Sequence, residues 1–152
     1  MVGGGAVKKL PANLLLVLLL SALTPAFAGQ ELVLITSTTS NVEQLDSPLV
    51  RRLFLGLTVS QHGSRLRPVL NESDSQMKEV FLQNVVSMSE STYDRYVLQL
   101  SLQQGRKQPV VYQSTAQLIN RVATDPSAVS YAWRKDVEHD GRIRILRVVW
   151  HD

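Results

Sequence analysis

The amino-terminal segment, residues 1–28, has the layout of a cleavable secretory signal peptide. Lys8 and Lys9 give it a positive start, a short apolar run follows at residues 14–20, and Ala26-Phe27-Ala28 forms a small-x-small cleavage site. The apolar run is much shorter than the ~20 residues that a bilayer span requires. We therefore expect cleavage after Ala28 and no membrane span after processing, so that a stable fold must form within residues 29–152.

Cysteine is absent from the chain. The protein therefore cannot form disulfides, and it cannot carry a lipid on a cysteine. Small secreted animal domains are usually held together by disulfides, so export without them fits a bacterial envelope better. We predict a periplasmic protein that is exported, soluble and not lipidated.

The mature segment is nearly neutral. The whole chain has 16 Lys and Arg against 13 Asp and Glu, a formal charge of +3, which falls to +1 once Lys8 and Lys9 are removed. No cluster of basic residues is interleaved with aromatic ones, so the sequence does not predict a nucleic-acid partner. The length of residues 29–152 suits one domain.

Five segments are predicted to be strands, the first of them because it is a short, apolar run rich in β-branched residues. Pro68 favours an edge position or a bulge for the second of them. In the last, the alternation slips at Leu146, which predicts a bulge there. The five segments are Glu31–Thr36, Leu66–Leu70, Val110–Tyr112, Ala128–Trp133 and Ile143–Trp150.

Four segments have helical periodicity and end signals. The first has Ser47 as expected N-cap, Pro48 in its first turn and Gly56 as its stop. The second follows a capping box formed by Ser73 and Gln76, the third spans about Ser91 to Gln104, and the fourth follows Ser114. Strands and helices in this mixed order predict an α/β fold, with a mixed sheet of about five strands flanked by about four helices. We expect Phe54, Phe81 and Tyr131 in its core.

Several short stretches together resemble a known family. They are Leu53-Phe54-Leu55-Gly56 with Arg67-Pro68-Val69, then Ser75 to Phe81, and finally the segment from Asp125 to Tyr131. In this order and spacing they resemble short periplasmic phosphate-binding-like proteins, which are reduced relatives of the substrate-binding subunits of phosphate ABC transporters. The resemblance covers nearly all of residues 29–152. It implies a type 2 periplasmic-binding-protein fold with an anion bound at helix N-termini.

The candidate ligand-binding residues are short polar side chains that follow the first predicted strand or precede and begin the second helix. Unpaired backbone N–H groups at a helix start attract anions, and hydroxyl groups add donors without bulk. Where the family has an Arg that clamps the anion, this chain has Asn71. Helix capping and turn formation are the competing interpretation for the serines and threonines. The candidates are Thr38, Thr39, Ser40, Asn71, Ser73, Ser75 and Gln76.

The sequence does not indicate an enzyme. His62, His139 and His151 are scattered, and no metal-ligand spacing, cysteine nucleophile or G-x-S-x-G turn occurs. We expect neither a cofactor nor a metal. Two functions from different classes stay open: a solute-binding protein that delivers a small anion such as phosphate to a membrane permease, or a ligand-less periplasmic interaction or sensory module that partners a sensor kinase or an envelope assembly.

Overall fold

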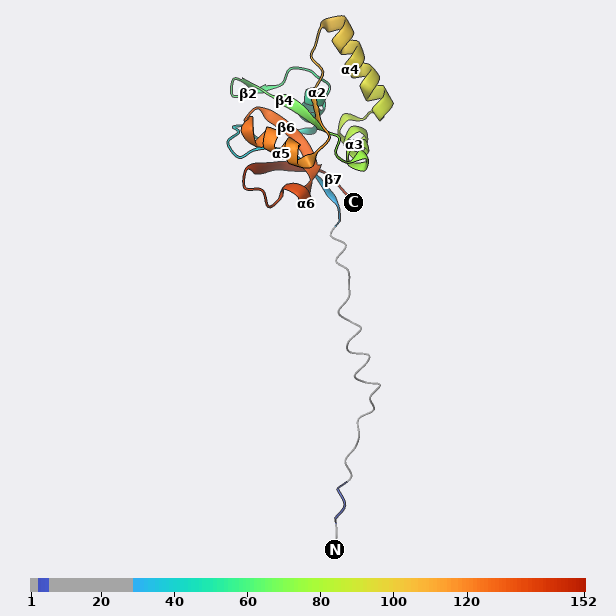
Figure 1. Ribbon diagram of the computed structural model, residues 1–152, viewed down its shortest axis with the longest axis vertical. Coiled ribbons are helices and arrows are strands. Elements are labelled where there is room, and N and C mark those ends of the chain that lie inside the picture. The colour runs from blue at the N-terminus through green and yellow to red at the C-terminus, as the bar shows by residue number, and fades with distance from the viewer. Residues whose placement is uncertain (1–2, 6–28) are drawn as a thin grey trace.

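The computed structural model describes residues 3–5 and 29–152 of the chain. Most of the predicted signal peptide, including its cleavage motif, lies outside the described residues. From Glu31 on, the chain folds around a central sheet with helices on both faces (Figure 1). Within the described segments, no helix is both long and apolar enough to cross a membrane.

Five strands form the main sheet in the order β5-β4-β6-β1-β7. β4 is parallel to its neighbours β5 and β6, whereas β1 is antiparallel to both β6 and β7, so β7 runs in the same direction as β4. A separate hairpin is made by β2 and β3. The bounds are β1 (Glu31–Ser37), β2 (Ser60–Gln61), β3 (Ser64–Arg65), β4 (Arg67–Asn71), β5 (Val110–Tyr112), β6 (Ala128–Trp133) and β7 (Ile143–His151).

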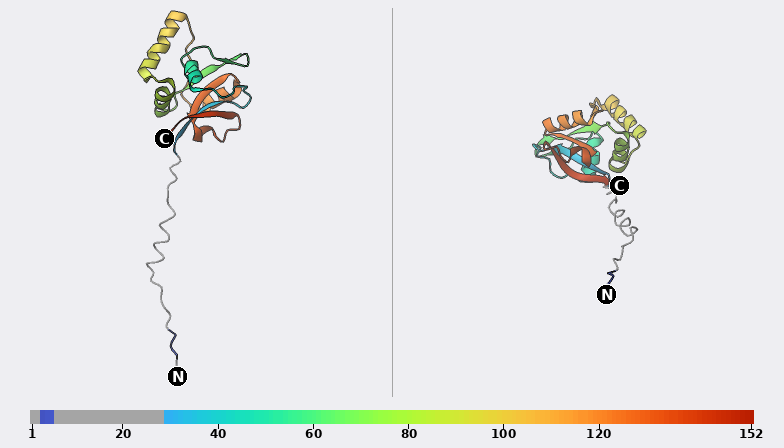
Figure 2. Two further views of the ribbon diagram at one scale, coloured as in Figure 1. Left: turned by 180° about the vertical axis from the view of Figure 1, so that it is seen from behind. Right: turned by 60° about the horizontal axis from the view of Figure 1, so that its bottom comes forward.

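The helices divide between the two faces of the sheet and confirm the predicted α/β class. One face is covered by α2, α3 and the π-helical turn η1 that continues α3; the other is covered by α5 and α6. α4 stands at the outside, away from the sheet, in both views of Figure 2. The bounds are α2 (Ser47–Phe54), α3 (Ser75–Phe81), η1 (Leu82–Val86), α4 (Glu90–Gln104), α5 (Thr115–Thr124) and α6 (Arg134–Val137).

β1 shows why the sheet must be covered on both sides. Its successive side chains point to opposite faces. Leu32 and Leu34 pack into the core beneath α2 and α3, while Val33 and Ile35 pack into the core beneath α5. A strand that is apolar at every position is typical of a sheet buried on both faces, and this is the arrangement observed.

The three aromatic residues expected in the core are fully buried and touch one another. The rings of Phe81 and Tyr131 are stacked with centroids 3.7 Å apart, and Phe54 meets Phe81 edge-on at 4.7 Å. The Tyr131 hydroxyl donates to the carbonyl of Asn71 at 3.1 Å. This cluster joins α2 and α3 to the central strand β6.

Two predicted helix starts are each displaced by one residue. Asp46, not Ser47, caps α2 and accepts from the Leu49 N–H at 2.9 Å. Asp74, not Ser73, caps α3. In both places two residues that favour the N-cap position are adjacent, and both capping aspartates have an extended backbone conformation. The predicted glycine stops are confirmed: Gly56 and Gly105 have φ of +76° and +61° after the ends of α2 and α4.

The prediction that Pro68 marks an edge or a bulge is wrong, because β4 lies inside the sheet between β5 and β6. The Arg67 N–H donates toward the β6 side, to the carbonyl of Ser127 at 2.8 Å, so the nitrogen of Pro68 faces the β5 side. Pairing with β5 begins only at Val69. The missing N–H of Pro68 therefore falls where no carbonyl of β5 needs it.

The final strand confirms the predicted bulge and contains a second one. The register of β7 against β1 skips Leu146 and again Val149. The four-residue helix α6 lies between the last two strands and was not predicted from the sequence.

Candidate functional site

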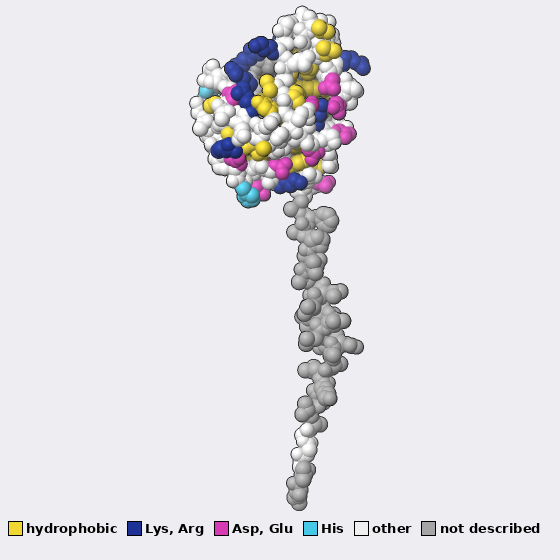
Figure 3. Space-filling view, in the orientation of Figure 1, with side chains coloured by type: hydrophobic (Ala, Val, Ile, Leu, Met, Phe, Trp, Pro, Cys, Tyr) yellow, Lys and Arg dark blue, Asp and Glu magenta, His cyan; other side chains and the backbone are white. Residues whose placement is uncertain are grey.

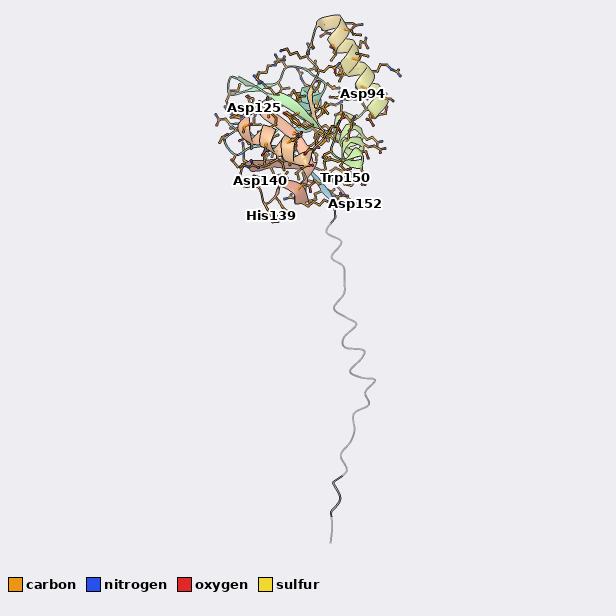
Figure 4. The ribbon with its side chains drawn as sticks, in the orientation of Figure 1. Asp94, Asp125, His139, Asp140, Trp150 and Asp152 are labelled. Carbon is orange, nitrogen blue, oxygen red and sulfur yellow. The ribbon has the colours of Figure 1, made fainter. Side chains whose placement is uncertain are left out.

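The parallel strands β4, β5 and β6 end at the same edge of the sheet, here termed the carboxyl edge. In open α/β sheets this edge is the usual place for a ligand, because strand-to-helix loops converge there. Figure 4 separates the two edges: Trp150 and Asp152 lie toward the carboxyl edge, whereas Asp125 and Asp140 lie on the opposite side.

The side chain of Asn71, at the end of β4, is completely buried and fully engaged in the fold. Its Nδ2 donates to the Tyr131 carbonyl at 3.0 Å. Its Oδ1 accepts from the N–H and the hydroxyl of Ser73, at 3.1 and 2.6 Å. Asn71 therefore fixes the loop that follows β4 and presents no free group to a ligand, in contrast to the clamping Arg that the resemblance places there.

Ser73 links the loop between β4 and α3 to the segment between β5 and α5. Besides its bond to Asn71, its hydroxyl shares a hydrogen bond with the Thr115 hydroxyl at 2.8 Å, at the first residue of α5. Because its hydroxyl is engaged in this way, Ser73 does not cap α3. Ser75 and Gln76, in the first turn of α3, are exposed.

A carboxylate already occupies the start of α3. Asp74 Oδ1 accepts from the Met77 N–H at 3.1 Å, and its Oδ2 accepts from the Trp133 indole N–H at 3.0 Å. The hydrogen bond from Trp133, then the one from the Met77 backbone, hold the pKa of Asp74 below its usual value, and the positive charge of Lys135 acts in the same direction. An anion arriving at this helix start would therefore meet a resident negative charge.

The charge of Glu72 at the same edge is balanced by Lys78. The Lys78 ammonium lies 2.6 Å from a carboxylate oxygen of Glu72 and 2.6 Å from one of Glu90. Burial by itself would lower the pKa of Lys78, but these two carboxylates outweigh it and raise that pKa. Lys78 is thus held in place by two acidic partners. Lys135, in the short helix α6 that follows β6, is exposed.

An open groove of about 680 Å³ lies along the carboxyl edge beside these residues. Trp133, Arg134 and Lys135 line one side of it, and Glu31 and Asp152 belong to its other walls. Arg134 forms an ion pair with Glu31. The lining of the groove therefore combines two basic residues, Arg134 and Lys135, with three acidic ones, Glu31, Glu138 and Asp152.

Thr38, Thr39 and Ser40 lie at the other edge of the sheet. β1 is antiparallel to β6, so the end of β1 meets the start of β6. The Thr38 N–H donates to the Arg142 carbonyl at 2.9 Å, and the Ser40 hydroxyl donates to the Pro126 carbonyl. The expectation that these residues share one site with Ser75 is wrong, because β1 is antiparallel to β6, and therefore to β4, so the ends of β1 and β4 lie at opposite edges of the sheet.

Sequence reasoning missed three residues at the carboxyl edge: Thr115, Arg134 and Lys135. Each directly follows a predicted strand or begins a predicted helix, so the rule that ligands gather at strand ends could have identified them. Trp133 is buried, and its indole N–H donates a hydrogen bond to Asp74 at the start of α3.

The fold resembles those of solved transport receptors. An ABC-type phosphate transport receptor from Vibrio cholerae matches 78% of this chain with a TM-score of 0.58 at 12% identity. PstS from Borrelia burgdorferi matches 78% with a TM-score of 0.54 at 14% identity, and a possible phosphate binding protein from Planctomyces limnophilus matches 78% with 0.54 at 11%. The matched segments make up 46%, 47% and 41% of those proteins, so this chain spans less than half their length.

No protein-family model and no curated protein matches the sequence. At this low identity the likeness shows the fold alone, and the fold is type 2 periplasmic-binding-protein-like, as the resemblance implied.

Proposed function

We propose that this chain is an exported, solute-binding-like protein whose ligand surface is the carboxyl edge of β4, β5 and β6. The observation that carries the proposal is the fold shared with transport receptors over 78% of the chain. Since the Vibrio cholerae protein is a phosphate transport receptor, a small oxyanion is the first ligand class to test. The proposal implies a membrane permease as the partner that receives the ligand.

The residues proposed to contact the anion are Ser75 and Gln76 at the start of α3. Ser73 precedes them in the same loop, and Lys135 is proposed to attract the anion by its charge. Both Ser75 and Gln76 are exposed and carry hydrogen-bond donors. Lys135 acts electrostatically on Asp74, so it places a positive charge near the start of α3. Asn71 is buried and uncharged, so it cannot supply the charge of the Arg that the family has at this position. Since the site lacks a two-pronged Arg contact, we expect a dissociation constant of roughly high micromolar to millimolar.

Calorimetric titration with phosphate and sulfate tests this proposal. We expect Ser75→Ala and Lys135→Ala to weaken phosphate binding. Thr38→Ala is the matched control, because it also removes an exposed hydroxyl group but at the opposite edge, and it should bind as the wild type does. Equal weakening in Thr38→Ala and Ser75→Ala would contradict the location of the site.

A second function, a ligand-less interaction or sensory module, is favoured by the Asp74 carboxylate. This side chain already accepts the Met77 and Trp133 N–H groups that an anion could otherwise engage. Asp74→Asn removes the negative charge and keeps an acceptor for the helix start. If the solute-binding proposal holds, this variant should bind phosphate more tightly than the wild type; absence of anion binding in both proteins would favour the interaction module.

Export is proposed on the sequence pattern of residues 1–28. The mature protein should begin at Gly29, which N-terminal sequencing of protein from the envelope fraction would show. Recovery of an intact Met1 on a cytoplasmic product would refute export and the periplasmic location.

A further inference from the structure

A second groove lies at the amino ends of β4 and β5, across the sheet from the candidate site. Its volume is about 950 Å³. Its walls come from the β2–β3 hairpin, the start of β4, the helix α5 and the loop that joins α4 to β5. Figure 3 shows Lys and Arg side chains gathered along one border of a hollow, with hydrophobic side chains beside them.

This groove concentrates positive charge. Five of the 16 Lys and Arg residues line it, and its described lining contains no Asp or Glu. Cations gathered in one groove repel one another, and this repulsion costs free energy. The groove is therefore suited to an anionic partner. The five residues are Arg65, Arg67, Arg106, Lys107 and Arg121.

Three of the five cations are already tied to this chain. Arg106 donates to the Gly56 carbonyl at 2.6 Å. Arg121 is paired with Asp125 at 2.9 Å, and Arg67 lies 3.8 Å from the same carboxylate. These contacts hold the walls in place and give the groove a fixed shape.

Arg65 and Lys107 are exposed and make no ion pair among the described residues. They come from the hairpin and from the α4–β5 loop, two separate walls of the groove. A compact oxyanion is bound best by donors that converge on one point. Cations on separate walls instead match an extended ligand that carries several negative charges.

The lining of the groove favours a peptide among extended anions. Three of its apolar residues, Leu53, Leu66 and Val69, are at most 3% exposed and are recessed, so exposed apolar surface in the groove is concentrated at Val110 on β5. No aromatic residue lines the described groove, so nucleic-acid bases would find no stacking surface.

Among the described residues, β5 has an unpaired outer edge with which an extended peptide could form backbone hydrogen bonds. It is an edge strand, and Val110, which lines the groove, is 51% exposed, with Val111 at 41%. The outer edge of such a strand offers backbone N–H and C=O groups to a further strand, and this mode of recognition is common for peptides. We propose that the groove binds an extended acidic segment of a partner protein, with its carboxylates against Arg65 and Lys107 and its backbone along β5.

The test uses a fluorescein-labelled peptide of about ten alternating Glu and Val residues and measures fluorescence anisotropy. The wild type should bind it, with an affinity that falls as salt screens the charges. The double variant Arg65→Glu/Lys107→Glu should lose affinity by at least about tenfold. Arg95→Glu, on the exposed surface of α4, makes the same kind of charge change outside the groove and should retain the wild-type affinity.

Three results would overturn the proposal. The first is that the wild type does not bind the peptide, and the second is that Arg95→Glu loses as much affinity as the double variant. The third is that the protein binds tripolyphosphate or phosphatidylglycerol vesicles instead of the peptide, in a way that depends on Arg65 and Lys107. A peptide with methylated backbone nitrogens keeps its charges but loses N–H donors, so it should bind more weakly; equal binding would refute the alignment along β5. None of these outcomes depends on phosphate binding at the carboxyl edge.

Discussion

Asp74→Ala should destabilise the protein more than Asp46→Ala, although both aspartates cap a helix. Loss of an N-cap costs about 1 kcal/mol. Among the described residues, the side chain of Asp46 accepts a hydrogen bond only from the Leu49 N–H, whereas the side chain of Asp74 accepts from both the Met77 N–H and the Trp133 indole N–H. Leaving the buried indole N–H without a partner adds roughly 1–2 kcal/mol. The expected losses of unfolding free energy are therefore about 1 kcal/mol for Asp46→Ala and about 2–3 kcal/mol for Asp74→Ala.

The effect of Asp74 should depend on pH. Its hydrogen bonds to Trp133 and Met77 depress its pKa in the folded state, so the folded protein binds this proton less tightly than the unfolded chain does. The stabilisation is then complete above the unfolded pKa, about 4, and is lost as the pH falls through the lower folded pKa. The difference between the wild type and Asp74→Ala should shrink between about pH 5 and pH 2.

Urea unfolding followed by far-UV circular dichroism measures these losses. The transition midpoint should shift while the slope with denaturant stays constant, since neither change alters the surface exposed on unfolding. Asp74→Asn should recover part of the loss, because its carbonyl can still accept from Met77. Equal losses in the two alanine variants, or a loss for Asp74→Ala that is unchanged at about pH 2, would refute this account of the site.

Two further predictions concern the buried aromatic residues. Phe81→Ala should lower the free energy of unfolding by about 3–5 kcal/mol in denaturant titrations, and Phe81→Leu by less, because Phe81 is fully buried against Tyr131; an unchanged midpoint would contradict the packing. Burial raises the pKa of both Tyr93 and Tyr131. The unfolded chain therefore loses these protons first, and stability should fall as the pH rises above about 10, in step with tyrosinate absorbance at 295 nm or so.

Much of the secondary structure follows from local chemistry. The strand Ala128–Trp133 has the predicted bounds, and all six of its residues are buried, as expected for a mostly apolar strand covered on both faces. Gly56 and Gly105 end α2 and α4 because both adopt positive φ, which glycine adopts without strain. The break in alternation at Leu146 likewise identified a bulge before its partner strand was known.

Competing local signals were not resolved by the sequence. Asp46 and Ser47 are both good N-caps, as are Ser73 and Asp74, and their relative positions along the chain do not decide between them. The choice depends on tertiary contacts: the Ser73 hydroxyl is engaged by Asn71 and Thr115, and Asp74 reaches the Trp133 indole. Pro68 is tolerated inside the sheet because of where β5 begins, which is also a tertiary property.

By itself, the sequence determined the α/β class, the strand segments, the helix stops and the set of short polar residues considered for a site. Only the tertiary structure decided which of those residues lie together. Hydrogen-bond pairing, not any local pattern, sets the direction of a strand, and β1 pairs antiparallel to β6. Because of this antiparallel pairing, Thr38, Thr39 and Ser40 lie at the edge opposite Ser75. The candidate site is therefore formed only by the loops that follow β4, β5 and β6.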